Sequence, residues 1–486
     1  MADQIKSQIF SGIKWNSIGQ LVRQSYSIVI SIILARLLLP EEFGLVAMLF
    51  IFAELANAFV NSGLSASLIQ RKNISSEECS TVFYFSIAVA LFLYVLFYLS
   101  APLIAHFYEN DALINLVKFY ALGFLLRSFD VVPNALFTRN LNYKTINTIQ
   151  SVASISSGVV AVCMAYLGYG PYSLVGQAIA LSAVSAIMSN LLSNWKPTFV
   201  FSISKFKEMY SFGVRIFFAS LLDKIFNAID NMIIGKLFGA NILGFYNRGK
   251  STKDIPVRNM VNIATNIVFP IFSKIDSINE LRSVFNRYIG LISYVICPVM
   301  LMLFITSDSF IYLLFSEKWM QSVPYLRLFC ILGITIPFNN VMAHTILSRG
   351  DYKKYLRIEL VKKGVIFIGM VFGLFFDAYW FLLILVVTHY IGLLIITIEV
   401  AKYIKSSALD IIKIIMPPFV ISMLIIIPMY FIGTLNIWSN ELIKFVVQCV
   451  VGIISYYLFS AAFRISEQRY IISEIKNRFN TSIKSS

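Results

Sequence analysis

Charged residues recur at helical spacing inside segments that are otherwise strongly apolar. Residues three or four positions apart share one face of a helix. A charged side chain within a membrane segment is costly, so it marks a functional path by default. The charged residues with this placement are Arg23, Arg36, Glu54, Arg127, Asp130, Asp223, Lys224, Asp230, Lys236, Arg248, Lys250, Asp254 and Arg258.

Basic residues outnumber acidic ones on these segments, which predicts a cationic cavity suited to an anionic ligand. Guanidinium groups pair well with phosphate. The predicted substrate-binding residues are Arg23, Arg36, Arg127, Lys224, Lys236, Arg248, Lys250 and Arg258. The predicted ion-coupling or charge-pairing residues are Glu54, Asp130, Asp223, Asp230 and Asp254. We expect Arg23, Lys224, Arg248 and Arg258 to line one water-filled space.

Two structural alternatives remain open for these residues. Arg36 and Lys236 lie near the ends of apolar segments, where a long basic side chain can reach the membrane interface without binding anything. Arg127 and Asp130 lie about one helical turn apart, so they can also form a neutralising pair.

The composition is that of an integral membrane protein. Hydrophobic residues make up 58% of the 486 residues, charged residues 13%, and the mean hydropathy is +0.77. The five cysteines lie far apart and the three histidines show no metal-binding spacing, so neither a metal nor another cofactor is expected. The net charge of +15 does not require nucleic acid as a partner, because the basic residues gather in short loops facing lipid headgroups.

About 20 apolar residues are needed for each membrane span. The sequence predicts fourteen spans at 13–38, 43–65, 80–105, 113–136, 146–168, 171–194, 210–236, 241–272, 286–308, 323–348, 358–377, 379–401, 413–435 and 441–464. With both termini inside, the inner segments carry 26 Lys and Arg residues and the outer loops only Lys318. The positive-inside rule therefore predicts cytoplasmic N- and C-termini.

A repeated stretch predicts that the protein is built from two similar halves. The stretch Ile33–Leu45 has a similar counterpart at Ile233–Phe245. In this match Arg36 corresponds to Lys236 and Gly44 to Gly244. Transporters are often built from such repeats, with the substrate at the repeat interface. We therefore expect an all-α polytopic protein of two pseudo-symmetric six-helix lobes, with the N-lobe at 1–209, the C-lobe at 210–401, and two further helices with a cytoplasmic tail at 402–486.

Four stretches resemble a known family. They are LARLLLPEEFGLVAM (Leu34–Met48), NSGLSASLIQRKNIS (Asn61–Ser75), VFPIFSKI followed by LRSVF (Val268–Phe285) and FSEKWMQSVPYLRLFCILG (Phe315–Gly333). They are similar to the Wzx-type polysaccharide and O-antigen flippases. The resemblance is strongest to the colanic-acid-exporter-like branch of the multidrug/oligosaccharidyl-lipid/polysaccharide exporter superfamily.

The resemblance implies a flippase that moves undecaprenyl-diphosphate-linked oligosaccharide across the bacterial inner membrane by alternating access, for O-antigen, capsule or exopolysaccharide assembly. It implies membrane lipids, and polymerase and chain-length proteins of the same pathway, as partners. A lipid II flippase and a drug or cation antiporter of the same superfamily are the alternatives. An enzyme such as a polysaccharide polymerase or ligase is disfavoured, because the outer loops are short and hold one lysine and one histidine, Lys318 and His106.

Overall fold

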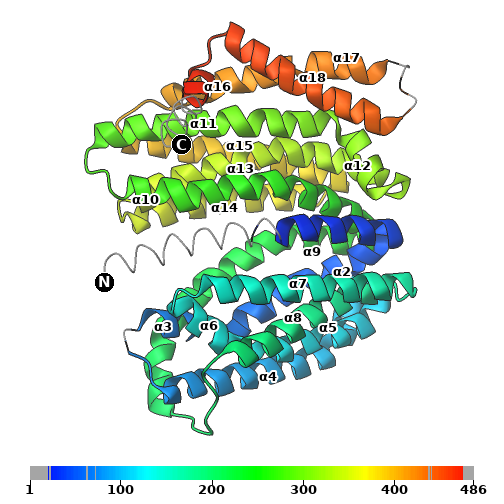
Figure 1. Ribbon diagram of the computed structural model, residues 1–486, viewed down its shortest axis with the longest axis vertical. Coiled ribbons are helices and arrows are strands. Elements are labelled where there is room, and N and C mark those ends of the chain that lie inside the picture. The colour runs from blue at the N-terminus through cyan, green and yellow to red at the C-terminus, as the bar shows by residue number, and fades with distance from the viewer. Residues whose placement is uncertain are drawn as a thin grey trace, which may run out of the picture. The chain divides into compact units, whose positions relative to one another are not determined.

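The computed structural model describes residues 20, 23–61, 64–71, 73–435, 438 and 440–473, with side chains described throughout except at 61, 211–220, 222, 223 and 227. Every regular element in this part of the chain is helical, which confirms the all-α polytopic fold (Figure 1). Helices satisfy every backbone polar group within one segment, as hydrocarbon requires. The chain forms two compact units, Met1–Gly244 and Phe245–Ser486.

The first unit combines long apolar helices with two short ones. Its elements are a helix at 23–37, α2 (Pro40–Asn61), α3 (Leu64–Gln70), α4 (Ser76–Tyr108), α5 (Ala112–Ser128), α6 (Val131–Arg139), α7 (Tyr143–Tyr166), α8 (Tyr172–Leu192) and the part of α9 (Ile203–Ile263) that precedes residue 245. Helices α7 and α8 pack along each other, as do α4 and α5.

The second unit holds the remainder of α9 and all later helices. Its further elements are the π-helix η1 (Ala264–Val268), α10 (Phe269–Phe272), α11 (Ile278–Ile305), α12 (Ser307–Phe315), the 3₁₀ helix η2 (Glu317–Ser322), α13 (Val323–Leu347), α14 (Tyr352–Gly373), α15 (Ala378–Tyr403), α16 (Ala408–Leu424), α17 (Ile426–Thr434) and α18 (Glu441–Ala462). An apolar core in this unit joins side chains of α11, α13, α15 and α16.

Each predicted span has a helix at its position, but not every helix has the length and apolarity of a span. Among the described residues, nine helices meet that standard, or ten if α5 and α6 count as one bent span. The first, seventh, eighth and eleventh predicted spans are not among them. The count of fourteen therefore stays a prediction, whereas a multi-pass helical membrane protein is confirmed.

Polar caps begin several of the helices. At α4, the Ser75 hydroxyl accepts a hydrogen bond from Glu78 N, and the Glu78 carboxylate accepts one from Ser75 N at 2.8 Å. Ser407 and Asp410 form the same capping box at α16. Such caps satisfy backbone donors that have no partner within the helix.

The fourth predicted span was expected as one helix, and this prediction is wrong. It breaks into α5 and α6, which are bent by 43°. The physical reason is Pro133, which has no N–H to donate to the carbonyl of Phe129 and whose ring crowds that carbonyl. The Asn190 side chain of α8 donates to the freed Phe129 oxygen at 2.9 Å instead.

The second predicted span also ends differently from expectation. It was expected to run over 43–65, but α2 ends at Asn61 and a separate short helix, α3, begins at Leu64. Two predicted spans of the first unit are therefore discontinuous. Helices α3 and α6 pack against each other, so the two short segments are neighbours.

The two copies of the repeated stretch cross each other in the first unit. A Cβ atom on Gly44 would overlap the carbonyl oxygen of Ala240, and a Cβ on Gly244 would overlap that of Pro40. Pro40 and Ala240 correspond at the same offset of 200 as the two glycines. The contact is therefore reciprocal, as in an interface between two identical surfaces.

Helix α9 breaks where the sequence predicted it, at Gly239, whose φ of 81° favours glycine. The division into compact units falls five residues later, between Gly244 and Phe245. The predicted seventh helix thus makes its contacts with the first unit. An example is Lys224, whose Nζ lies 2.6 Å from Glu54 Oε2 of α2. The lobe boundary at 209/210 stays a prediction drawn from the repeat.

Candidate functional site

A polar hollow lies where the two discontinuous segments meet. It has a volume of about 180 Å³, which leaves room for several water molecules. Its lining comes from α3, the end of α5 and α6: Ser65, Ile69, Arg127, Asp130, Val131, Asn134, Ala135 and Thr138. Two of these, Arg127 and Asp130, are predicted site residues, and discontinuous membrane helices often build binding sites in transporters.

Arg127 and Asp130 share the hollow without forming an ion pair. The Arg127 side chain is exposed and has no carboxylate partner among the described residues. Asp130 is half-buried, and its Oδ2 accepts a hydrogen bond from the Ser185 hydroxyl of α8 at 3.1 Å. The alternative of a neutralising pair is therefore wrong for this structure, because the bend between α5 and α6 comes between the two residues.

The wall of the hollow is held by an arginine at the end of α6. Arg139 Nη1 donates to the carbonyl oxygens of Leu68, at 2.9 Å, and of Arg71. Arg71 in turn pairs with Glu78 at 2.7 Å and with Glu208 at 3.1 Å. These contacts fix α3 to α6, α4 and the start of α9.

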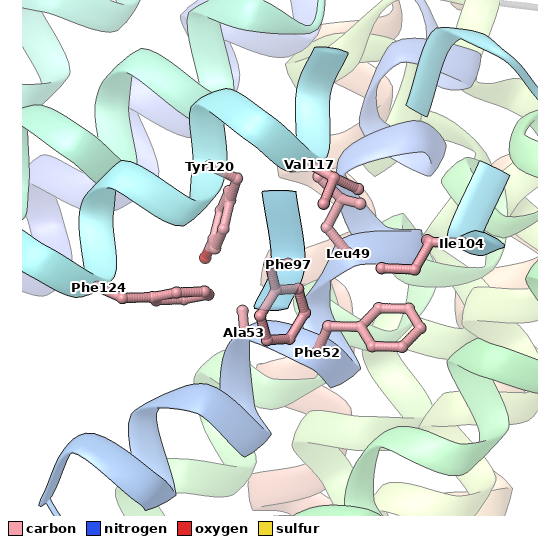
Figure 2. Close-up of a pocket in the computed structure, with 8 residues that line it drawn as sticks. All are labelled: Leu49, Phe52, Ala53, Phe97, Ile104, Val117, Tyr120 and Phe124. Carbon is pink, nitrogen blue, oxygen red and sulfur yellow. The ribbon is translucent and has the colours of Figure 1, made fainter. Parts of the chain in front are cut away.

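A second hollow in the first unit has the opposite character. It lies among α2, α4 and α5 and has a volume of about 10 Å³, enough for about one water molecule. Figure 2 shows that aliphatic and aromatic side chains line it, including Leu49, Phe97 and Phe124. This hollow is a packing gap in an apolar core and offers no polar recognition.

The other predicted residues of the first unit have different surroundings. Arg23 Nη1 donates to Asn147 Oδ1 of α7 at 2.6 Å. Lys224 Nζ lies 2.6 Å from Glu54 Oε2, which brings together two predicted residues of opposite charge. Asp230 is buried, and Arg36 is exposed near the end of its helix. The Asp223 side chain lies outside the described residues.

Lys236, in the second copy of the repeated stretch, forms an ion pair with Glu109. Its Nζ lies 2.7 Å from Glu109 Oε1 and 5.5 Å from the centre of the Phe107 ring. The hydrogen bond from Lys236, and then its charge, hold the pKa of the exposed Glu109 carboxyl below its usual value. The ion pair with the exposed Glu109 agrees with the alternative that Lys236 reaches the membrane interface and does not bind substrate.

The predicted residues of the second unit differ sharply in burial. The Arg248 guanidinium is 5% exposed and lies 4.4 Å from the centres of both the Phe315 and the Trp319 ring. The Arg258 side chain is 77% exposed, and its Nη2 lies 3.4 Å from Asp254 Oδ2. The ammonium group of Lys250 lies 5.9 Å from the centre of the Tyr246 ring. The structure therefore places Arg248 within an aromatic layer and Arg258 at the surface of its unit.

Sequence reasoning missed Ser65 and Thr138, which line the polar hollow, and Arg139, which holds α3 against α6. Ser65 follows a Ser-Gly pair in the sequence, and such pairs commonly interrupt helices. That signal could have indicated the separate helix α3. Arg139 gave no signal beyond its place in a basic loop.

Comparison with known proteins agrees with the fold and with the sequence resemblance. The family model described as "Polysaccharide biosynthesis protein" matches residues 33–324, more than half of the chain. The teichuronic acid biosynthesis protein TuaB of Bacillus subtilis is 29% identical over 349 residues, covering 71% of this chain and 72% of TuaB. The lipopolysaccharide biosynthesis protein WzxC of Escherichia coli is 23% identical and covers 76% of each chain.

Among solved structures, the lipid II flippase MurJ in an inward closed conformation shares the fold. The TM-score is 0.73, with 16% identity over 92% of this chain and 98% of MurJ. The chain therefore belongs to the polysaccharide biosynthesis protein family.

Proposed function

We propose that this protein moves undecaprenyl-diphosphate-linked oligosaccharide from the cytoplasmic to the periplasmic leaflet of the bacterial inner membrane by alternating access. The observation that carries the proposal is the polar hollow of the first unit, with Arg127 in its wall, an arginine that has no carboxylate partner in the described part of the chain. The diphosphate and the sugars cannot cross hydrocarbon unaided, because each unsatisfied polar group costs several kcal/mol there. A membrane protein with an internal polar surface provides the missing partners.

The diphosphate would bind to the basic residues predicted on the polar helix faces. Lys224 can take this role only if phosphate replaces the Glu54 carboxylate, which lies 2.6 Å from the ammonium group in this structure. Exchange of one anionic partner for another leaves the lysine satisfied in both states. Substrate binding would thereby release Glu54, which gives the acidic residues a part in the transport cycle.

The chemistry of the hollow disfavours a drug or cation antiporter but does not distinguish this proposal from a lipid II flippase. A drug or cation antiporter needs an anionic site, but in this hollow the Arg127 guanidinium lies beside the Asp130 carboxylate and would repel a cation. A lipid II flippase shares the fold and would differ only in the sugar carried. We propose no covalent chemistry for this chain, and we place polymerase and chain-length proteins downstream of it as partners.

The orientation with both termini in the cytoplasm is part of the proposal, and the uneven loop charge supports it. Single cysteines introduced at residues 349–357 should therefore react with an impermeant maleimide only after the cells are permeabilised. A cysteine at Lys318 should react in intact cells. Labelling of residues 349–357 from outside would overturn the orientation.

Complementation tests the function itself. Expression of the chain in a strain that lacks its own flippase but makes the matching repeat unit should restore surface glycan. Arg127→Ala should weaken substrate binding by roughly ten- to a hundredfold, since it removes a charged hydrogen-bond donor, and surface glycan should fall accordingly. Immunoblotting of membranes should show unchanged abundance.

The control variant is Thr148→Ala on α7, an exposed residue whose hydroxyl donates to the Lys144 carbonyl oxygen of its own helix at 2.9 Å. It should leave surface glycan unchanged. If the abundant wild-type chain gives no surface glycan in the matching strain, the flippase assignment is wrong.

A further inference from the structure

We propose that the polar hollow between α3, α5 and α6 recognises a glycosyl unit of the substrate and that the diphosphate binds elsewhere. This inference rests on the proposed flippase function. It assigns a ligand class to the hollow from the balance of hydrogen-bond donors and acceptors in its wall.

The hollow offers several polar atoms that no protein group satisfies. Among the described residues, the Ser65 hydroxyl, the Arg127 guanidinium and the Asn134 Nδ2 have no side-chain or backbone partner. The Asn134 Oδ1 has only a weak contact, at 3.5 Å, with the Thr138 hydroxyl. Asp130 Oδ1 is buried without a hydrogen-bond partner in the described part of the chain, whereas Oδ2 accepts a hydrogen bond from Ser185.

These groups include strong donors and strong acceptors within one small space. Arginine can only donate, an ionised carboxylate can only accept, and the amide and hydroxyl groups do both. A ligand that satisfies the whole set must therefore offer donors to Asp130 and acceptors to Arg127 at the same time.

A diphosphate does not meet this requirement. Its oxygens would suit Arg127, but they carry negative charge and would be repelled by the Asp130 carboxylate. A metal cation fails for the opposite reason, because Arg127 would repel it. Sugar hydroxyls donate and accept from the same atom, so a glycosyl unit can satisfy both residues at once.

The size and rigidity of the hollow agree with such a ligand. Its volume of about 180 Å³ is far larger than one ordered water molecule needs. Ile69, Val131 and Ala135 contribute apolar surface on which the C–H groups of a sugar ring can pack. The bend that positions Asp130 is fixed by Asn190, and Arg139 holds α3 against α6, so little ordering is needed on binding.

The test compares two lipids on the purified full-length chain in nanodiscs. One probe is undecaprenyl diphosphate without sugar. The other is the undecaprenyl-diphosphate-linked repeat unit extracted from cells that make it but lack the transporter. Asp130→Asn and Asn134→Ala should each weaken binding of the sugar-bearing lipid about tenfold and leave binding of the bare lipid unchanged. Thr148→Ala should change neither affinity.

Binding of the bare lipid also shows that each variant is folded, and a thermal melt provides a second check. Equal weakening for both lipids would place the diphosphate in the hollow and overturn the inference, as would unchanged binding of both. The flippase assignment itself is tested separately, by complementation with the wild-type chain. Failure of the folded wild-type chain to bind either lipid would instead contradict the proposed function itself.

Discussion

Valine in place of Gly44 or Gly244 is expected to abolish the folded, transport-competent protein. Each glycine lies where two helix backbones touch, and even a Cβ atom would overlap a carbonyl oxygen of the other repeat. A flexible side chain could move aside, but a backbone carbonyl cannot move without displacing its helix. Overpacking in a core typically costs about 1–3 kcal/mol when neighbouring groups can adjust, and we expect a cost well above that range here, because the obstructing atoms are backbone. Because the contact is reciprocal, the two substitutions should have nearly equal effects.

Size-exclusion profiles, thermal melts and surface glycan of the two variants measure this effect. Gly123→Ala is the matched control, because its Cβ would meet only the Ser182 hydroxyl oxygen, at 4.0 Å. That variant should fold and transport normally, with a small gain in helix stability. Normal melting of the Gly44 and Gly244 variants would show that the two helices do not need this close approach.

Arg248→Ala is expected to cause the largest loss of stability among the predicted binding arginines. The guanidinium is buried between the Phe315 and Trp319 rings, 4.4 Å from each ring centre. A desolvated cation–π contact contributes up to about 2 kcal/mol, and truncation also leaves a cavity. We expect a loss of roughly 2–5 kcal/mol, which lowers the melting temperature of a chain of 486 residues by about 2–5 °C.

Arg258→Ala is the control, because that arginine is on the same helix with a side chain that is 77% exposed. The melting temperature of the Arg258→Ala variant should stay within about 1–2 °C of the wild type, as expected for a surface change. Arg248→Lys should restore only part of the lost stability, since an ammonium group does not stack on the rings as a planar guanidinium does. Equal melting temperatures for Arg248→Ala and Arg258→Ala would refute the aromatic packing role.

Hydropathy was sufficient to predict the helical membrane fold. In hydrocarbon, a spanning segment must hydrogen-bond its own backbone groups, and a helix does this within one segment. The repeat likewise predicted that Gly44 and Gly244 are equivalent. The gap between the predicted spans 210–236 and 241–272, which contains Gly239, predicted the break in α9. The sequence could not show that the two copies pack on each other. That contact depends on backbone positions 200 residues apart.

The candidate site was less predictable, for a physical reason that Arg248 and Arg127 illustrate. Helical spacing places both arginines on polar faces, but it does not show which neighbours cover those faces. Phe315 and Trp319 come from a distant segment and bury Arg248. Arg127 stays exposed because Pro133 bends the following helix, which separates it from Asp130. Pro133 was visible in the sequence, but its effect on the adjacent charges was not.

The reciprocal crossing of the repeats also has an evolutionary consequence. In an ancestor with two identical chains, one glycine codon would have supplied both contacts, and one mutation would have damaged both at once. In the fused chain, Gly44 and Gly244 are separate codons that can change independently. Because each glycine faces a backbone carbonyl of the other repeat, we expect larger residues to be excluded at both positions separately.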